Sequence, residues 1–181
     1  MNTKGNFSFK RGRFTVRHMM FPILCALCMI PLTVSAGGGK VNFSGTWTLN
    51  ESKSTIGEGR FRLSSMIVAK QDENNLELQR TRTGRDGQPV TLTEKLTLDG
   101  KESVSEGENR TTKTTANWSE DKKNLIISST MSFTREGQTT EIKSDETWQL
   151  SEDGKTLTIK YHSVSPRGER NDVLVYDKKT E

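Results

Sequence analysis

The feature of this sequence that most restricts its fold is an alternation of apolar and polar residues with a period of two. Leu125, Ile127, Met131 and Phe133 lie on one side of such a stretch, and Ser and Thr fill most of the positions between them. This pattern is typical of strands with one face in a core and the other in solvent. No apolar stripe with helical spacing lasts three turns after residue 36, so the sequence predicts an all-β fold. The same alternation runs through 43–49, 90–98, 140–150 and 157–161.

Short polar turns separate these stretches. Asp86-Gly87, Asp99-Gly100 and Asp153-Gly154 are pairs that accept the positive φ of tight hairpin turns. Ten stretches are candidates, and we expect eight or nine strands because some of them merge: 43–50, 62–70, 75–83, 89–98, 101–106, 110–119, 124–135, 139–150, 156–164 and 170–177.

Consecutive hairpins form an up-and-down meander, and closure of such a sheet removes its exposed edges. About eight strands enclose an interior that side chains or one small ligand can fill. We therefore predict an antiparallel meander that forms a lipocalin-like barrel of about eight strands. A two-sheet sandwich is the alternative, although its crossed connections need longer links than this sequence offers.

Two of the predicted hairpins resemble each other. The segments 118–127 and 151–159 both read as an acidic turn, a lysine and a strand. Neighbouring antiparallel hairpins produce such a pattern without any duplication of function. The three tryptophans, Trp47, Trp118 and Trp148, are expected in the core, since a large ring of this kind favours burial.

The first 36 residues predict an export signal. Residues 1–18 contain five Lys and Arg residues and no acidic residue, and a mostly apolar run follows over 19–34. Together with the small residues Ser35 and Ala36, this is the pattern of a secretory signal peptide with cleavage near Ala36. An uncleaved anchor helix is the alternative, but the run is short for a membrane span and contains two prolines. We expect residues 37–181 to form one domain that is secreted or periplasmic.

Removal of this signal changes the charge of the chain. Five of its 27 Lys and Arg residues and none of its 23 Asp and Glu residues lie in 1–36, so residues 37–181 carry 22 basic and 23 acidic side chains. No basic cluster with interleaved aromatic residues remains, which argues against nucleic-acid binding. Both cysteines, Cys25 and Cys28, also leave with the signal. The domain then has no disulfide and no cysteine metal site.

The stretch from Phe43 to Leu49, which contains Gly45-x-Trp47, resembles the lipocalin-like (calycin) signature of exported bacterial β-barrel proteins. The ending segments 150–159 and 175–178 are also similar to theirs. This resemblance implies that Gly45 and Trp47 close the floor of the barrel. It also implies a basic residue near the last strand that packs over the tryptophan, for which Arg170 is the candidate.

Three charged residues, Arg80, Glu94 and Glu146, occupy positions that the alternation turns toward the interior. Buried charges are unfavourable unless they are paired or solvated. In one interpretation, Arg80 pairs with Glu94 or Glu146 as a structural plug, or the interior is hydrated. In the other, the three residues line a polar pocket for a small amphipathic ligand. A register shift of one residue would instead move all of them outside.

Nothing after residue 36 predicts catalysis. His162 is the only histidine there and is expected to point outward, which argues against a haem ligand, a zinc site or a histidine-based triad. Glu94 and Glu146 are two carboxylates, but the sequence does not define their separation, so no acid–base role is assigned.

The sequence therefore predicts a non-catalytic exported barrel, without cofactor or metal, that binds a small lipophilic or amphipathic ligand. The alternative is a structural or protein-interaction barrel whose core is filled by its own side chains. Contact with a membrane is expected only through the export signal, and the oligomeric state is not predicted. Fold class alone does not choose between these functions.

Overall fold

The computed structural model describes residues 40–57 and 63–180. The predicted export signal, residues 1–36, lies outside the described residues. Within the described part, no helix is long and apolar enough to cross a membrane. A short 3-10 helix, η1 (Glu51–Lys53), accompanies ten strands: β1 (Gly45–Leu49), β2 (Met66–Gln71), β3 (Asn75–Thr83), β4 (Pro89–Thr97), β5 (Ser103–Gly107), β6 (Arg110–Trp118), β7 (Asn124–Arg135), β8 (Gln138–Leu150), β9 (Thr156–Ser165) and β10 (Gly168–Lys178).

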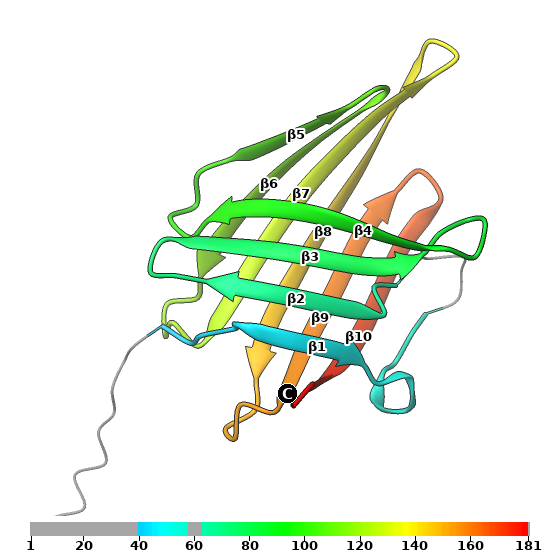
Figure 1. Cartoon of the computed structure of the whole chain (residues 1–181). Helices are drawn as coiled ribbons and strands as arrows, with labels where there is room; N and C mark the ends of the chain where they lie inside the picture. The colour runs from blue at the N-terminus through cyan, green and yellow to red at the C-terminus, as the bar shows by residue number, and fades with distance from the viewer. Residues whose placement is uncertain (1–39, 58–62, 181) are drawn as a thin grey trace, which may run out of the picture. The chain divides into compact units, whose positions relative to one another are not determined.

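All ten strands belong to one antiparallel sheet with the order β4-β3-β2-β1-β10-β9-β8-β7-β6-β5 (Figure 1). Nearly every neighbour in space is also a neighbour in sequence, as in an up-and-down meander. The pairing of β1 with β10 joins the first strand to the last. β4 and β5 end this order and do not pair with each other, although β4 contacts both β5 and β6. The predicted all-β antiparallel meander is confirmed, and it forms a nearly closed barrel.

The predicted number of about eight strands is wrong, because the structure has ten. None of the ten candidate stretches merges with its neighbour. Gly100 shows why at the boundary of β4 and β5, where its φ of 79° lies in the left-handed region. Its amide donates to the carbonyl of Ala116 at 3.1 Å, and a Cβ at this position would clash with Asn117. The chain therefore turns here and starts a separate strand.

The apolar side chains of the inner face gather at one end of the barrel, which we call the apolar end. Its largest fully buried side chains include Phe43, Trp47, Trp148 and Tyr176. The ring of Phe43 stacks on Trp118 at 6.0 Å between centroids and meets Trp148 edge-on at 5.7 Å. Trp118 is only partly buried against this core, whereas the other two tryptophans are fully buried. Aromatic burial of this kind supplies much of the stability of a domain without disulfides.

The inner face becomes polar farther along the same strands, in a region that we call the polar end. β7 and β8 reach farthest in this direction, with 12 and 13 residues. Its inward-facing polar residues include Arg80, Glu94, Thr114, Ser129, Ser144, Glu146, Ser163 and Asp172.

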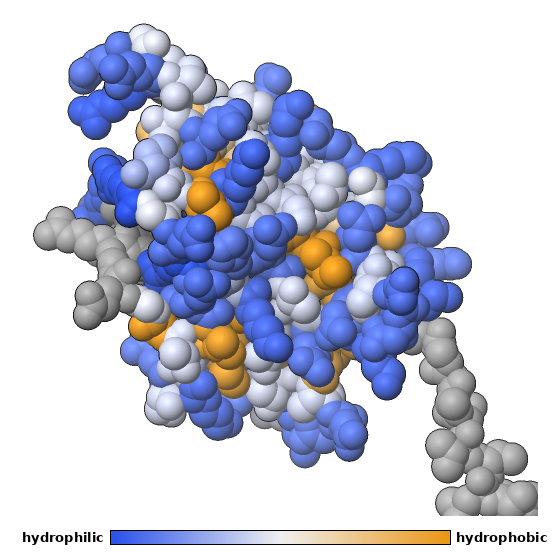
Figure 2. Space-filling view, turned by 180° about the vertical axis from the view of Figure 1, so that it is seen from behind, coloured by the Kyte–Doolittle hydropathy of each residue, from blue (hydrophilic) through white to orange (hydrophobic). Residues whose placement is uncertain are grey.

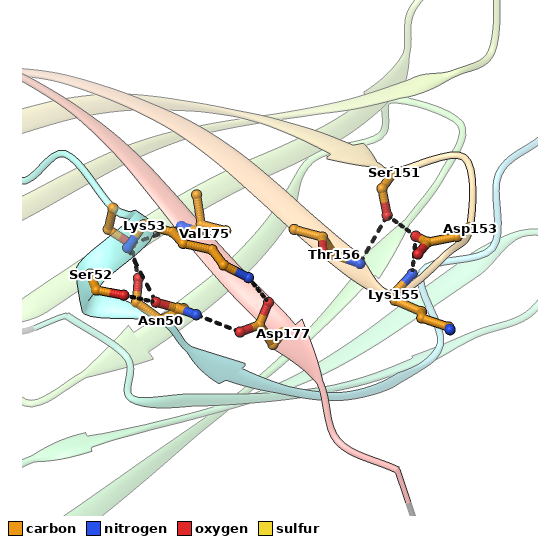
Figure 3. A network of polar contacts seen from close by, with 10 residues as sticks. Asn50, Ser52, Lys53, Ser151, Asp153, Lys155, Thr156, Val175 and Asp177 are labelled. Carbon is orange, nitrogen blue, oxygen red and sulfur yellow. Dashed lines mark hydrogen bonds and ion pairs between the residues drawn. The ribbon is translucent and has the colours of Figure 1, made fainter.

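A network of polar contacts fixes the segment after β1 against β10 (Figure 3). Asn50 caps η1 by accepting a hydrogen bond from the Lys53 amide at 3.2 Å. The Asn50 side-chain amide also donates to Asp177 Oδ2 at 2.5 Å, and Lys53 Nζ donates to Asp177 Oδ1 at 3.0 Å. The hydrogen bonds from Asn50 and Lys53 lower the pKa of Asp177, so its carboxylate stays ionised at neutral pH.

The two turns with similar sequences have the same hydrogen bonds. The hydroxyl of Ser151 donates to Asp153 Oδ1 at 2.6 Å and accepts from the Thr156 amide at 3.0 Å (Figure 3). These bonds let a short polar side chain satisfy backbone groups that the turn leaves unpaired. Identical distances occur in the other turn, between Ser119, Asp121 and Asn124.

The two turns differ at one residue with a left-handed backbone, which yields a stability prediction. Gly154 has a φ of 66° in one turn, and Lys122 has a φ of 57° at the equivalent place in the other. A Cβ at Gly154 would meet nothing within 4 Å, so a side chain at this position would cause backbone strain but no steric clash. We expect Gly154→Ala to lower the free energy of unfolding by about 1 kcal/mol and Lys122→Gly to raise it by about 0.5 kcal/mol. Urea denaturation measures both changes, and equal losses in the two variants would contradict this explanation.

Candidate functional site

Arg80, Glu94 and Glu146 come together at the polar end, and all three face inward. They reach this place from different strands, since Arg80 lies on β3, Glu94 on β4 and Glu146 on β8. Arg80 Nη2 lies 2.7 Å from Glu146 Oε2, and Arg80 Nε lies 3.6 Å from Glu94 Oε2. The structure therefore joins the three predicted residues in one cluster around a single guanidinium group.

Trp148 orients the closer of these two pairs. Its indole Nε1 donates to Glu146 Oε2 at 2.7 Å, so this oxygen accepts hydrogen bonds from both Trp148 and Arg80. The guanidinium carbon of Arg80 also lies 5.4 Å from the centroid of the Trp148 ring, within the range of a cation–π interaction. A fully buried ring thus holds the ion pair in position.

The three side chains of this cluster differ in exposure. Arg80 and Glu146 are 16% and 17% exposed, whereas Glu94 is 35% exposed. Burial alone lowers the pKa of Arg80, but the charges of Glu146 and Glu94 outweigh it and hold the pKa above its ordinary value. Arg80 is therefore a permanent cation held mainly by Glu146, and Glu94 is its weaker and more open partner.

Asp172 is a buried acidic residue that sequence reasoning missed. Its side chain is fully buried on the inner face of β10, where it accepts hydrogen bonds from Arg170 Nε at 2.5 Å and from the Gly57 amide at 2.7 Å. These contacts attach the segment after η1 to the last strand. The alternation offered a signal for Asp172, because it precedes the inward-facing Leu174 and Tyr176 by two and four residues.

Arg170 does not pack over Trp47 as the resemblance implied, because the register of β1 with β10 places it far from that ring, and its guanidinium binds the neighbouring Asp172 carboxylate. Lys178 takes that place, with Nζ 5.2 Å from the centroid of the Trp47 ring. Gly45 makes room for this contact, since a Cβ there would lie 2.9 Å from Lys178 Cε, and its φ of 150° disfavours other residues. The Gly-x-Trp motif therefore shapes the apolar end of the barrel.

A pocket of about 640 Å³ opens at the polar end, between the β7–β8 turn and the β9–β10 turn. Phe133 and Ile142 line it with apolar groups, and Thr140 and Ser165 continue the inward alternation of β8 and β9. The sequence placed Phe133, Thr140 and Ile142 on inward faces, but the pocket also needs the two turns to lie at the same end of the sheet. The remaining lining residues are Arg135, Glu136, Gln138, Pro166 and Arg167.

Two apolar residues on the inner face of β4 are open to solvent. Val90 is 39% exposed and Leu92 is 37% exposed, although both occupy inward-facing positions of that strand. Because β4 does not pair with β5, this part of the inner face remains accessible. On the side seen from behind, apolar groups form separate patches among hydrophilic side chains (Figure 2).

Other polar groups in the described part of the chain do not form a metal site. No three His, Cys, Asp or Glu side chains within 40–57 and 63–180 are placed to hold a metal ion. His162 lies on the outer face with 42% of its side chain exposed, and its Nε2 is 3.9 Å from Glu169. A hollow of about 420 Å³ lies beside Asp72, which accepts hydrogen bonds from the amides of Asn74 and Asn75 and so shapes the β2–β3 turn.

No protein-family model and no curated protein matches this chain. Among solved structures, the chain is similar to a zebrafish ileal bile acid-binding protein in complex with cholic acid. The two share 17% sequence identity with a TM-score of 0.47, over 76% of this chain and 98% of that chain. The fold of this chain is therefore assigned from its own strand order.

The Arg80 cluster yields a prediction about stability. Glu146→Gln removes the charge that holds the buried Arg80, and we expect the free energy of unfolding to fall by on the order of 3 kcal/mol. Glu94→Gln removes a longer and more exposed contact, so a loss below about 1 kcal/mol is expected. Guanidinium chloride denaturation compares the two. A larger loss in the Glu94 variant would show that the longer contact holds the cation.

Proposed function

We propose that this chain is an exported, lipocalin-like barrel that binds a small amphipathic molecule at its polar end and has no catalytic role. The observation that carries this proposal is the pocket of about 640 Å³ between the β7–β8 and β9–β10 turns. Its volume lies within the range of roughly 300–1,000 Å³ that is common for small-molecule sites. Cleavage near Ala36 would place the domain in the periplasm or outside the cell.

The lining of the pocket suits a molecule with an apolar body and a polar group. Phe133 on β7 lies opposite Thr140 on β8 and diagonal to Ile142, and the two apolar side chains offer an apolar wall. Thr140 and Ser165 offer hydroxyl groups, which donate and accept hydrogen bonds. A mixture of apolar walls and a few polar groups is what orients small ligands.

Of the three interior charged residues, we assign Glu94 to ligand contact, and Arg80 and Glu146 to the support of the barrel. Arg80 and Glu146 satisfy each other at 2.7 Å with the help of Trp148. Glu94 lies 3.6 Å from Arg80 and is 35% exposed, but it does not line the pocket, so its oxygens would accept hydrogen bonds from a bound molecule that extends from the pocket into the interior. The exposed inner face at Val90 and Leu92 lies on the same strand and offers further apolar surface.

A structural or protein-interaction barrel is the second candidate. The observation in its favour is that the apolar end is filled by the chain's own side chains, with Phe43, Trp47 and Trp148 fully buried. Native mass spectrometry of protein purified from its own host separates the two candidates. A co-purifying small molecule supports the first proposal, and repeated purification without one favours the second.

A matched pair of substitutions on β8 tests the location of the site. Thr140→Trp places a large ring among the residues that line the pocket, whereas Thr139→Trp places the same ring on the outer face of the same strand. We expect Thr140→Trp to weaken binding of the neutral fluorescent probe N-phenyl-1-naphthylamine at least about tenfold, since the ring occupies the pocket volume. Thr139→Trp should leave the affinity within about twofold. Equal affinities in both variants, with unchanged circular dichroism, would place the site elsewhere.

A further inference from the structure

Arginine side chains surround the pocket at the polar end. Arg135 is the last residue of β7 and lies on the same alternation as the inward-facing Phe133, and Arg167 lies in the turn between β9 and β10. Figure 1 shows these two turns at the same end of the sheet. Glu136 is the acidic residue among those that line the pocket.

A third arginine, Arg110, does not line the pocket but lies opposite one of its lining residues, and Glu108 precedes it in the β5–β6 turn. Arg110 begins β6 and pairs in register with Phe133, so it shares the inward side of the sheet with that ring. Within 40–57 and 63–180, neither Arg110 nor Arg167 forms an ion pair. Arg135 lies 3.6 Å from Glu136, but both side chains are more than 80% exposed, and solvent screens such a pair.

Other acidic residues of these hairpins are directed to the outer face. Glu141 lies opposite Ser132 on the outward alternation of β7 and β8, where Ser132 Oγ donates to it at 3.4 Å. Glu169 lies near the outward-facing His162. The residues that line the pocket therefore include two arginines and one glutamate, and the local charge is positive.

We propose that this pocket binds amphiphiles with an anionic headgroup, such as a carboxylate or a sulfate, which Arg135 and Arg167 hold at the rim. This inference rests on the small-molecule binding proposed above. The planar guanidinium group matches such oxyanions with paired hydrogen bonds, and its charge is permanent. Phe133 and Ile142 contact the apolar body of the ligand. A pocket of about 640 Å³ has room for one such molecule, so the proposed ligand is a single dispersed amphiphile.

The experiment compares three molecules with the same twelve-carbon chain by displacement of N-phenyl-1-naphthylamine, below their micelle concentrations and at about pH 8, where carboxylates are ionised. Dodecanoate is anionic, dodecanol is neutral and dodecyltrimethylammonium is cationic. We expect dodecanoate to bind at least about tenfold tighter than the other two, and this advantage to shrink as salt rises.

The variant Arg135→Gln/Arg167→Gln should reduce the preference for dodecanoate over dodecanol to below about threefold, because both rim charges are lost. Its affinity for dodecanol should stay the same. The control, Lys143→Gln/Lys160→Gln, removes two charges from the outer faces of β8 and β9 and should keep the full preference.

Each contrary result has a distinct meaning. Equal affinity for the three headgroups overturns the anionic preference and leaves small-molecule binding intact. Failure of the probe and of all three amphiphiles to bind overturns both proposals. Binding to vesicles with anionic lipid, without binding of dispersed dodecanoate, also overturns the inference, because the arginines would then serve a membrane surface.

Discussion

The short strand β1 holds this barrel together, because it pairs with β2 on one side and with β10 on the other. Without it, no backbone pairing would join the two halves of the sheet, and they would be held together by contacts across the interior, such as the ion pair of Arg80 with Glu146, and by those of β4 with β5 and β6. β1 has only five residues, so few hydrogen bonds join the two halves of the sheet. Trp47 fills the interior beneath this junction, and Gly45 lets Lys178 approach closely enough to cover the ring.

The interior has two parts, an apolar end that stabilises the fold and a polar end that is available for binding. The apolar end buries its aromatic rings completely and supplies most of the hydrophobic stabilisation. The polar end therefore does not have to supply this stabilisation, and charged and hydroxyl-bearing side chains can occupy it. Trp148 connects the two, since its ring belongs to the core while its Nε1 holds Glu146 toward Arg80. The ion pair is thus positioned by packing and not by the strands alone.

Much of this architecture follows from alternation in the sequence, which predicted the meander and the inward side of Arg80, Glu94 and Glu146, and offered the pairing of Arg80 with one of the two glutamates as one interpretation. It could not decide which basic residue covers Trp47. Arg170 and Lys178 lie on the same side of β10, and the pairing register of β1 with β10 decides between them, because it places Lys178 opposite Trp47. Alternation also could not show that the turn at Asp99-Gly100, expected as a hairpin turn, joins two strands that do not pair. The pocket depended on where two turns lie in space, which periodicity does not encode.

The missing pairing between β4 and β5 has a mechanical consequence for such a barrel. A fully closed cylinder of strands can widen only by breaking interstrand hydrogen bonds, because each strand is fixed on both sides. A sheet with an unpaired seam can instead widen as a split ring does, when the strands on either side of the seam move apart. Such a motion would leave the ladder of hydrogen bonds intact, and only side-chain contacts across the interior and the seam would oppose it. The interior could then change its width without local unfolding.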